Sequence, residues 1–210
     1  MSSGKLYIIS APSGAGKTSL VRQLIADIDN LSVSISHTTR RIRPGETDGV
    51  DYFFISHDEF HQLLQDHALL EHARVFDNFY GTAKTTVACN LNAGMDVILE
   101  IDWQGAQQIK RILPDCLSIF ILPPSTDILE QRLQNRGQDD DQVIARRMRD
   151  AVTEMSHYEE FDYLIVNDVF DRALTELKSI IVANRLTKDR QQQKHQTLIN
   201  SLLSSTNKSI

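Results

Sequence analysis

The stretch "SAPSGAGKTSL", residues 10–20, places a glycine-rich loop between two segments of different periodicity. The preceding residues, KLYIIS, are apolar and rich in β-forming side chains, whereas TSLVRQLIADI repeats apolar side chains at helical spacing. Glycine permits backbone conformations and close approaches that other residues prevent. The sequence therefore predicts a strand, a loop of small residues and a helix, an order that suits anion binding at the helix N-terminus.

The loop matches the phosphate-loop pattern G-x-x-x-x-G-K-[ST] at Gly16, Lys17 and Thr18, with Ala11 in place of the first glycine. If Ala11 keeps an ordinary backbone conformation, the N–H groups from Ser13 to Lys17 point at the β-phosphate of a nucleotide. Lys17 would then bridge the β- and γ-phosphates, and the Thr18 hydroxyl would hold Mg²⁺. The alternative is a glycine-rich turn with a surface lysine.

The composition of the 210-residue chain is that of an ordinary globular protein, with 41% hydrophobic and 24% charged residues. A formal net charge of -6 argues against broad nucleic-acid binding. No apolar run is long enough to span a bilayer, and the N-terminus lacks a secretory signal, so we expect no membrane partner and a cytoplasmic location. Cys89 and Cys116 lack the spacing of metal ligands and are expected to be buried, reduced thiols.

Strand-like runs recur along the chain and alternate mostly with helical patterns. They are LYIIS, LSVSIS, MDVILEID, LSIFIL and DYLIVN. This alternation predicts an α/β fold with a parallel sheet covered by helices on both faces. Ligands of such sheets gather at the carboxyl ends of the strands.

Two stretches look inserted into this pattern. Residues 36–86 contain a short strand, YFFI, a helix that begins at the capping box of Ser56 and Glu59, and a strand around LLEHARVF. The second stretch follows Pro123-Pro124 and contains the loop RGQDDD between two arginine-bearing helices, which suggests a mobile flap.

Arginines gather in both insertions. In SHTTRRIRPGE, two of Arg40, Arg41 and Arg43 could clamp a phosphate monoester together with Tyr52, although a solvated charged turn is the alternative. The second insertion carries four more, and its helical spacing puts the first two on one face. These are Arg132, Arg136, Arg146 and Arg147. They could neutralise charge on a transferring phosphoryl group, or pair with the aspartates at 139–141.

Three carboxylates stand at positions suited to binding. Glu100 and Asp102 end an apolar strand, where Asp102 could orient Mg²⁺ through water or cap the helix that follows. Glu71 could accept hydrogen bonds in parallel from guanine N1–H and the N2 amino group, which adenine cannot offer. Alternatively, Glu71 is an exposed strand residue.

The ordered motifs resemble those of bacterial guanylate kinases over nearly the whole chain. They include SAPSGAGKT, SHTTRRIRPGE, LLEHARVF, FYGT, EIDWQGAQQI, RLQNRG and DYLIVND. The resemblance implies one domain with a five-stranded parallel sheet of the P-loop NTPase type. It divides the chain into a core (1–35, 87–124 and 157–210), a GMP-binding lobe (36–86) and a lid (125–156). It also implies Mg-ATP and GMP, and dGMP in addition, as substrates.

The resemblance implies the following site residues. Those for GMP are Ser36, Arg40, Arg43, Tyr52, Glu71, Tyr80, Thr82 and Glu100. Those for ATP are Ser13, Gly14, Ala15, Gly16, Lys17, Thr18, Ser19 and Asn167, with Asn167 near the adenine. Those around the transferred phosphoryl group are Lys17, Arg132, Arg136 and Arg147, and those for Mg²⁺ are Thr18 and, through water, Asp102.

Three positions depart from the family pattern: Ala11, Thr82 in place of a serine, and Glu100 in place of an aspartate. The longer side chain of Glu100 is expected to shift its contacts to the base or to Arg40. Two other functions remain open: a kinase for another nucleoside monophosphate, and a non-catalytic module that binds peptides, although the intact phosphate loop disfavours the latter. The helical C-terminus could pack on the core or pair with another subunit in a homo-oligomer.

Overall fold

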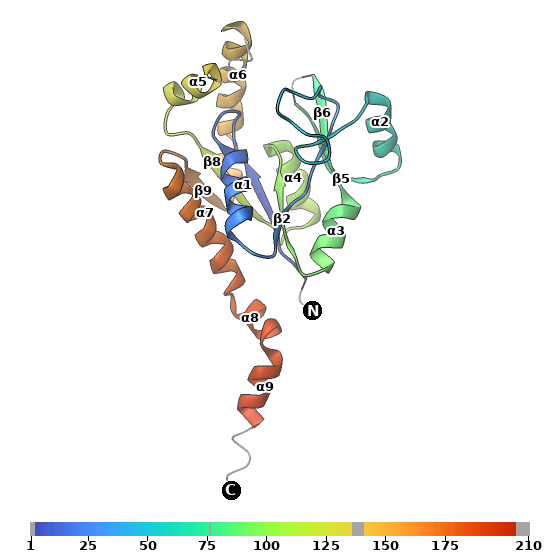
Figure 1. Cartoon of the computed structure of the whole chain (residues 1–210), viewed down its shortest axis with the longest axis vertical. Helices are drawn as coiled ribbons and strands as arrows, with labels where there is room; N and C mark the ends of the chain where they lie inside the picture. Colours follow the sequence, from blue (N-terminus) through green and yellow to red (C-terminus); the bar gives the residue numbers. More distant parts are fainter. Residues whose placement is uncertain (1–2, 76, 136–140, 205–210) are drawn as a thin grey trace.

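A parallel β-sheet forms the centre of the computed structural model, which describes residues 3–75, 77–135 and 141–204 (Figure 1). The strand order is β2-β7-β1-β8-β9, and every pairing is parallel, as the sequence predicts. The strands are β1 (Leu6–Ser10), β2 (Leu31–Val33), β7 (Asp96–Glu100), β8 (Leu117–Leu122) and β9 (Tyr163–Val166). A 3-10 helix (Tyr158–Glu160) precedes β9.

Helices cover both faces of this sheet. They are α1 (Lys17–Asp27), α3 (Lys84–Asn92), α4 (Trp103–Ile112) and α7 (Phe170–Arg185). Tyr7 and Ile9 of β1 pack with α1 and α7 on one face, whereas Leu6 and Ile8 pack with α3 and α4 on the other. Because successive side chains of a strand point to opposite faces, the run LYIIS, which is apolar apart from Ser10, is buried on both sides.

A second sheet with the strand order β4-β3-β6-β5 lies beside the first. Its elements are β3 (His37–Thr38), β4 (Phe53–Phe54), β5 (Leu69–Val75) and β6 (Asn78–Ala83), together with α2 (His57–Gln65), which begins at the predicted capping box. LSVSIS is only partly a strand of the central sheet, because the chain leaves that sheet after β2 and joins the second at β3. The sequence pattern did not predict β6.

Helices α5 (Thr126–Gln134) and α6 (Asp141–Met155) stand together at the end of the molecule above β8 and the start of α1 (Figure 1). They have their own apolar cluster of Leu129, Leu133, Ile144 and Ala151. The two predicted arginine-bearing helices are therefore confirmed. The predicted flap loop between them falls at residues 136–140, outside the described residues.

The C-terminal helices differ in whether they pack on the core. Helix α7 packs on the core, whereas α8 (Lys188–Lys194) and α9 (Gln196–Ser204) extend away from the sheet (Figure 1). Asp96, only 1% exposed, accepts hydrogen bonds from Arg185 and Arg190, both at 2.8 Å. A buried carboxylate thus fixes the base of this arm. No residue of α9 is buried.

Cys116 is buried, as expected, but the expectation for Cys89 is wrong, because Cys89 is exposed. Helix α3 turns Val87 into the core and leaves Cys89 on its outer side. Among the described helices, none combines the length and the apolar character that crossing a membrane requires.

Candidate active site

The glycine-rich loop joins β1 to α1, as the sequence predicts. Gly14 and Gly16 both have a φ of 93°, a left-handed conformation that favours glycine. Ala11 has no positive φ, so its ordinary backbone conformation is confirmed. Lys17 is the first residue of α1, with Thr18 and Ser19 exposed behind it. The loop therefore has the backbone form that an anion-binding turn requires.

Asn167 and Arg132 hold this loop from behind. The Asn167 amide donates to the Ala15 carbonyl oxygen at 2.7 Å, and the Arg132 guanidinium donates to the carbonyl oxygens of Asn167 (3.1 Å) and Ala15 (3.4 Å). A Cβ at Gly16 would lie 2.4 Å from the Asn167 amide nitrogen. Asn167 is thus a support of the phosphate loop, a role that sequence analysis missed. Its contact with adenine stays a prediction.

Oxygen atoms suited to magnesium gather at the start of α1. The Thr18 hydroxyl donates to the Glu100 carboxylate at 3.3 Å. Asp102 lies nearby. Burial raises the pKa of its carboxyl, and the positive charge of Lys17 opposes that rise. One Asp102 oxygen caps α4 by accepting the Gly105 N–H at 2.9 Å, while the role of Asp102 towards Mg²⁺ through water stays a prediction. The other accepts from the Gln104 amide.

This donor set fits Mg²⁺ in its chemistry, since Mg²⁺ prefers oxygen ligands and usually keeps several waters and substrate phosphates. Within the described ranges, no group of three or more His, Cys, Asp or Glu residues could hold a metal by itself. A metal here would depend largely on phosphate oxygens and water.

Arg40 follows β3 of the second sheet and lies in a cluster of polar and aromatic side chains. Its guanidinium donates to both oxygens of Glu46, at 3.0 and 2.8 Å, and stands 5.3 Å from the centre of the Tyr52 ring. The Arg40 side chain is 11% exposed, so a solvated turn is the wrong interpretation for this residue. Its observed carboxylate partner is Glu46, whereas Glu100, expected to shift towards it, contacts Thr18.

Arg43, Tyr52 and Tyr80 belong to the same cluster. The Arg43 N–H donates to Glu46 at 2.8 Å, and the rings of Tyr52 and Tyr80 meet edge to face at 5.9 Å. Burial raises the pKa of Tyr52 to about 12, so its hydroxyl remains a hydrogen-bond donor at neutral pH. The structure thus brings together the four residues assigned to the GMP phosphate.

Glu71 lies on β5 with only 3% of its surface exposed, so the exposed-strand alternative is wrong. The Thr82 hydroxyl donates to one of its oxygens at 2.5 Å, and the Ser36 hydroxyl oxygen lies 3.4 Å from that of Thr82. The pKa of Glu71 is raised to about 7, mainly by burial and in part by Asp102, although Thr82 and Lys17 oppose the rise. A ligand with two adjacent donors would compensate this buried carboxylate.

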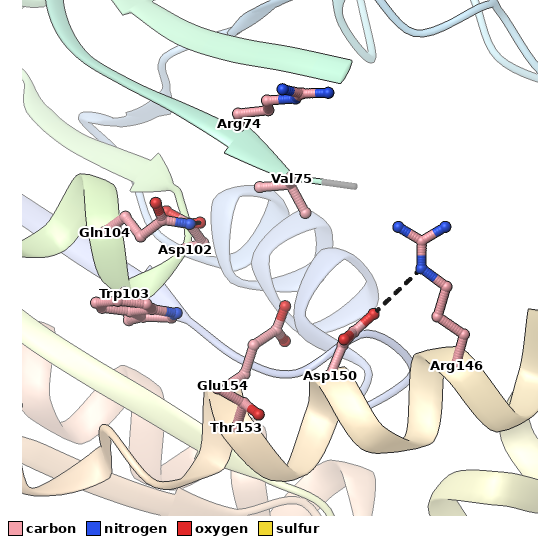
Figure 2. A pocket seen from close by; sticks show the side chains of 9 residues that line it. All are labelled: Arg74, Val75, Asp102, Trp103, Gln104, Arg146, Asp150, Thr153 and Glu154. Atoms are coloured by element: carbon pink, nitrogen blue, oxygen red, sulfur yellow. Dashed lines mark hydrogen bonds and ion pairs between the residues drawn. The ribbon is translucent and has the colours of Figure 1, made fainter. Parts of the chain in front are cut away.

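A cavity of about 310 Å³ opens between the end of β5, the start of α4 and α6 (Figure 2). It is lined by Arg74, Val75, Asp102, Trp103, Gln104, Arg146, Asp150, Thr153 and Glu154. Figure 2 shows the side chains of α6 rising towards the end of β5. Arg146 pairs with Asp150 and, across to the second sheet, with Asp77. Arg147 lies on α6, half-buried, and Arg136 falls outside the described residues.

Sequence analysis also missed Glu154. Burial raises the pKa of its carboxyl to about 7, while the Lys17 charge and the Ser13 N–H favour the ionised form. One of its oxygens is buried without a hydrogen-bond partner. Its helical spacing from Asp150 and Arg147, which puts the three on adjoining turns of one face, was the signal available.

A parallel sheet with a phosphate loop, a cluster of arginine and tyrosine side chains and a buried carboxylate defines a phosphate-loop kinase for a small phosphorylated substrate. The family model described as guanylate kinase matches residues 3–184. The guanylate kinase of Saccharophagus degradans is 60% identical over 96% of this chain and 98% of its own. That of Escherichia coli K12 is 57% identical over 97% and 99%.

A crystal structure of guanylate kinase from Anaplasma phagocytophilum superposes with a TM-score of 0.74, at 33% identity over 90% of each chain. The chain belongs to the guanylate kinase family. The protein is accordingly an enzyme, and the peptide-binding module is the wrong alternative.

Proposed function

We propose that GMP and ATP bind on opposite sides of the cavity between β5 and α6. The reaction is the family's transfer of the γ-phosphoryl group of ATP to GMP, which gives ADP and GDP. The observation that carries the arrangement is the segment from Glu100 to Gly105, which contacts both sides. Glu100 accepts from Thr18 of the phosphate loop at 3.3 Å, and a Cβ at Gly105 would lie 2.5 Å from Glu71 Oε2. A base bound at Glu71 and a polyphosphate bound at Lys17 would therefore be close neighbours.

The GMP side uses two groups of residues. Glu71 accepts from guanine N1–H and N2–H, with Ser36 and Thr82 as hydroxyl partners beside it. Arg40, Arg43, Tyr52 and Tyr80 bind the phosphate, and Glu46 gives up part of its pairing with Arg40 when that phosphate arrives. We assign Glu100 to the GMP side as well, because its charge raises the pKa of Tyr52 while its carboxylate accepts from Thr18.

The ATP side is the phosphate loop from Ser13 to Ser19. The loop N–H groups and Lys17 bind the β- and γ-phosphates, and Arg132, Arg136 and Arg147 neutralise charge on the transferring group. An oxygen of the GMP phosphate attacks the γ-phosphorus, and the bond to the oxygen that bridges β and γ breaks, with that oxygen leaving on ADP. The nucleophile is already an anion, so no strong general base is needed.

Thr18, and Asp102 through water, would hold Mg²⁺ with ATP. The ion would spread the negative charge of the phosphates. We also propose that dGMP is accepted, that the enzyme is cytoplasmic, and that it could form a homo-oligomer. In the same proposal, residues 36–86 and 125–156 close as lobe and lid over a core of 1–35, 87–124 and 157–210, which excludes water from the transferring group.

The test is ADP formation from ATP with Mg²⁺, with GMP, dGMP, AMP, UMP and CMP offered separately. Wild type should use only the guanine nucleotides, and Glu71→Gln should raise the KM for GMP, whereas the exposed control Glu176→Gln should not. Lys17→Ala should remove turnover. Full activity of Lys17→Ala, or an unchanged GMP-to-AMP preference in Glu71→Gln, would contradict the assignment.

A further inference from the structure

Helix α4 of the central sheet is joined to strand β5 of the second sheet directly beside Glu71. The Gln108 side-chain amide donates to the His72 carbonyl oxygen at 2.7 Å, and its oxygen accepts the His72 N–H at 3.2 Å. Strand β5 is an edge strand, so these main-chain groups have no neighbouring strand. The Gln108 amide replaces that neighbour, and the strand carrying Glu71 is tied to α4.

Gly105, one turn earlier on α4, touches the carboxylate itself. A Cβ at this position would lie 2.5 Å from Glu71 Oε2 and 3.2 Å from its carboxyl carbon. Gly105 has no positive φ, so its backbone conformation suits any residue. Glycine inside a helix costs about 1 kcal/mol relative to alanine. The space needed by Glu71 is therefore the reason the structure gives for a glycine here.

The carboxylate is confined from two sides. Thr82 of β6 donates to Oε1, and the first turn of α4 closes against Oε2. That turn cannot easily withdraw, because Asp102 caps it through the Gly105 N–H at 2.9 Å. The Glu71 side chain is almost fully buried, so neighbouring atoms of α4 and β6 restrict the position of this carboxylate.

We propose that α4 is a positioning element for guanine recognition. Gly105 leaves space for the Glu71 carboxylate, and Gln108 fixes the position of β5, the strand of Glu71, relative to α4. The proposal rests on the role proposed for Glu71 as the reader of guanine. It adds that the position of Glu71 depends on α4, which packs on the central sheet, as well as on the second sheet, to which β5 belongs. Gly105 and Gln108 then control guanine affinity through Glu71, with no effect on the phosphate loop.

The first variant is Gly105→Ala, whose methyl group displaces the carboxylate. We expect the Kd for GMP, measured by isothermal titration calorimetry, to rise roughly ten- to hundredfold, because small displacements of a buried polar group are costly. The KM for ATP should stay unchanged. Circular dichroism and thermal unfolding show whether the variant is folded, and alanine by itself favours the helix.

A double-mutant cycle with Glu71→Ala separates positioning from general damage. If Gly105 acts through the carboxylate, Gly105→Ala should weaken GMP binding in the wild-type background and change it no further in Glu71→Ala. Gln108→Leu should also raise the KM for GMP several-fold. The matched control is Gln107→Leu, because Gln107 is on the same helix but donates to Glu160 instead.

The outcomes distinguish the two proposals. Unchanged GMP affinity in Glu71→Ala overturns the reader itself. A weakened Glu71→Ala together with normal GMP affinity in Gly105→Ala, or a Gly105→Ala effect that persists in the Glu71→Ala background, overturns the positioning role of α4. If Gly105→Ala does not fold, the difference between Gln108→Leu and Gln107→Leu decides, and equal KM values for GMP count against the proposal.

Discussion

Acidification should weaken GMP binding through the protonation of Glu71. Burial raises the pKa of this carboxyl to about 7 in the ligand-free protein. Guanine offers two N–H donors, which pair with an ionised carboxylate and lower its pKa in the complex. GMP should therefore bind with its full affinity well above pH 7. The affinity should fall as the pH drops below 7, because binding must then remove a proton from Glu71.

The size of the effect follows from the pKa. At pH 6, about a tenth of Glu71 is ionised, so the Kd for GMP should be about tenfold higher than at pH 8.5, and about thirtyfold higher at pH 5.5. One tenfold step corresponds to about 1.4 kcal/mol of binding free energy. At pH 7, binding should release about half a proton per GMP.

The assay is calorimetric titration of GMP from pH 5.5 to 8.5, in two buffers whose ionisation enthalpies differ, so that released protons are counted directly. The GMP phosphate also titrates near pH 6. Glu71→Gln has the same shape without the proton and corrects for that titration. A wild-type-to-variant ratio of Kd values that stays flat across this range would refute the reasoning.

Three further predictions concern stability and the loop. Without ligand, Glu71→Gln should raise the free energy of unfolding at pH 8 by on the order of 3 kcal/mol and leave it nearly unchanged at pH 4. The reason is that the folded pKa of about 7 exceeds the ordinary 4.5, so wild type loses stability as the pH rises between these two values. Urea unfolding at pH 4 and pH 8 measures this, and an equal difference between variant and wild type at both pH values would count against it. Gly16→Ala should abolish turnover and lower the melting temperature, since its Cβ would lie 2.4 Å from the Asn167 amide; wild-type kcat and melting temperature would show that the loop tolerates a side chain. Asp96→Ala should destabilise the fold by about 3–5 kcal/mol, because it leaves two arginines without their buried partner; a loss under 1 kcal/mol in guanidinium unfolding would contradict this.

The parts of the fold that sequence predicts are those with a local pattern. The phosphate loop can be predicted from a pattern of a few residues. Runs such as LYIIS predict strands that are buried on both faces, because nearly all their residues are apolar. Strand β6 escaped prediction because NFYGTA has a central glycine and no clear alternation. It is a strand because β3 and β5 pair with it on both sides.

The site follows the same division. Residue types and order sufficed to nominate Lys17 and Glu71, but the local pattern left Glu71 open to being exposed. Alternation along β5 puts Glu71 on the buried face with Leu69 and Ala73, a place where a carboxylate is unexpected. The bond between His72 and Gln108 spans 36 residues of sequence and leaves no periodic trace, so only the folded chain reveals it.

The arm formed by α8 and α9 has a practical consequence for handling the enzyme. It leaves the molecule at the end opposite α5 and α6 (Figure 1), and Leu203 near its tip is 68% exposed. A fluorophore or a surface linkage placed there would stand clear of the cavity between β5 and α6, whereas one on α6 would obstruct that cavity. Because Arg190 ties α8 to Asp96, a label on the arm would be joined to the core through this ion pair.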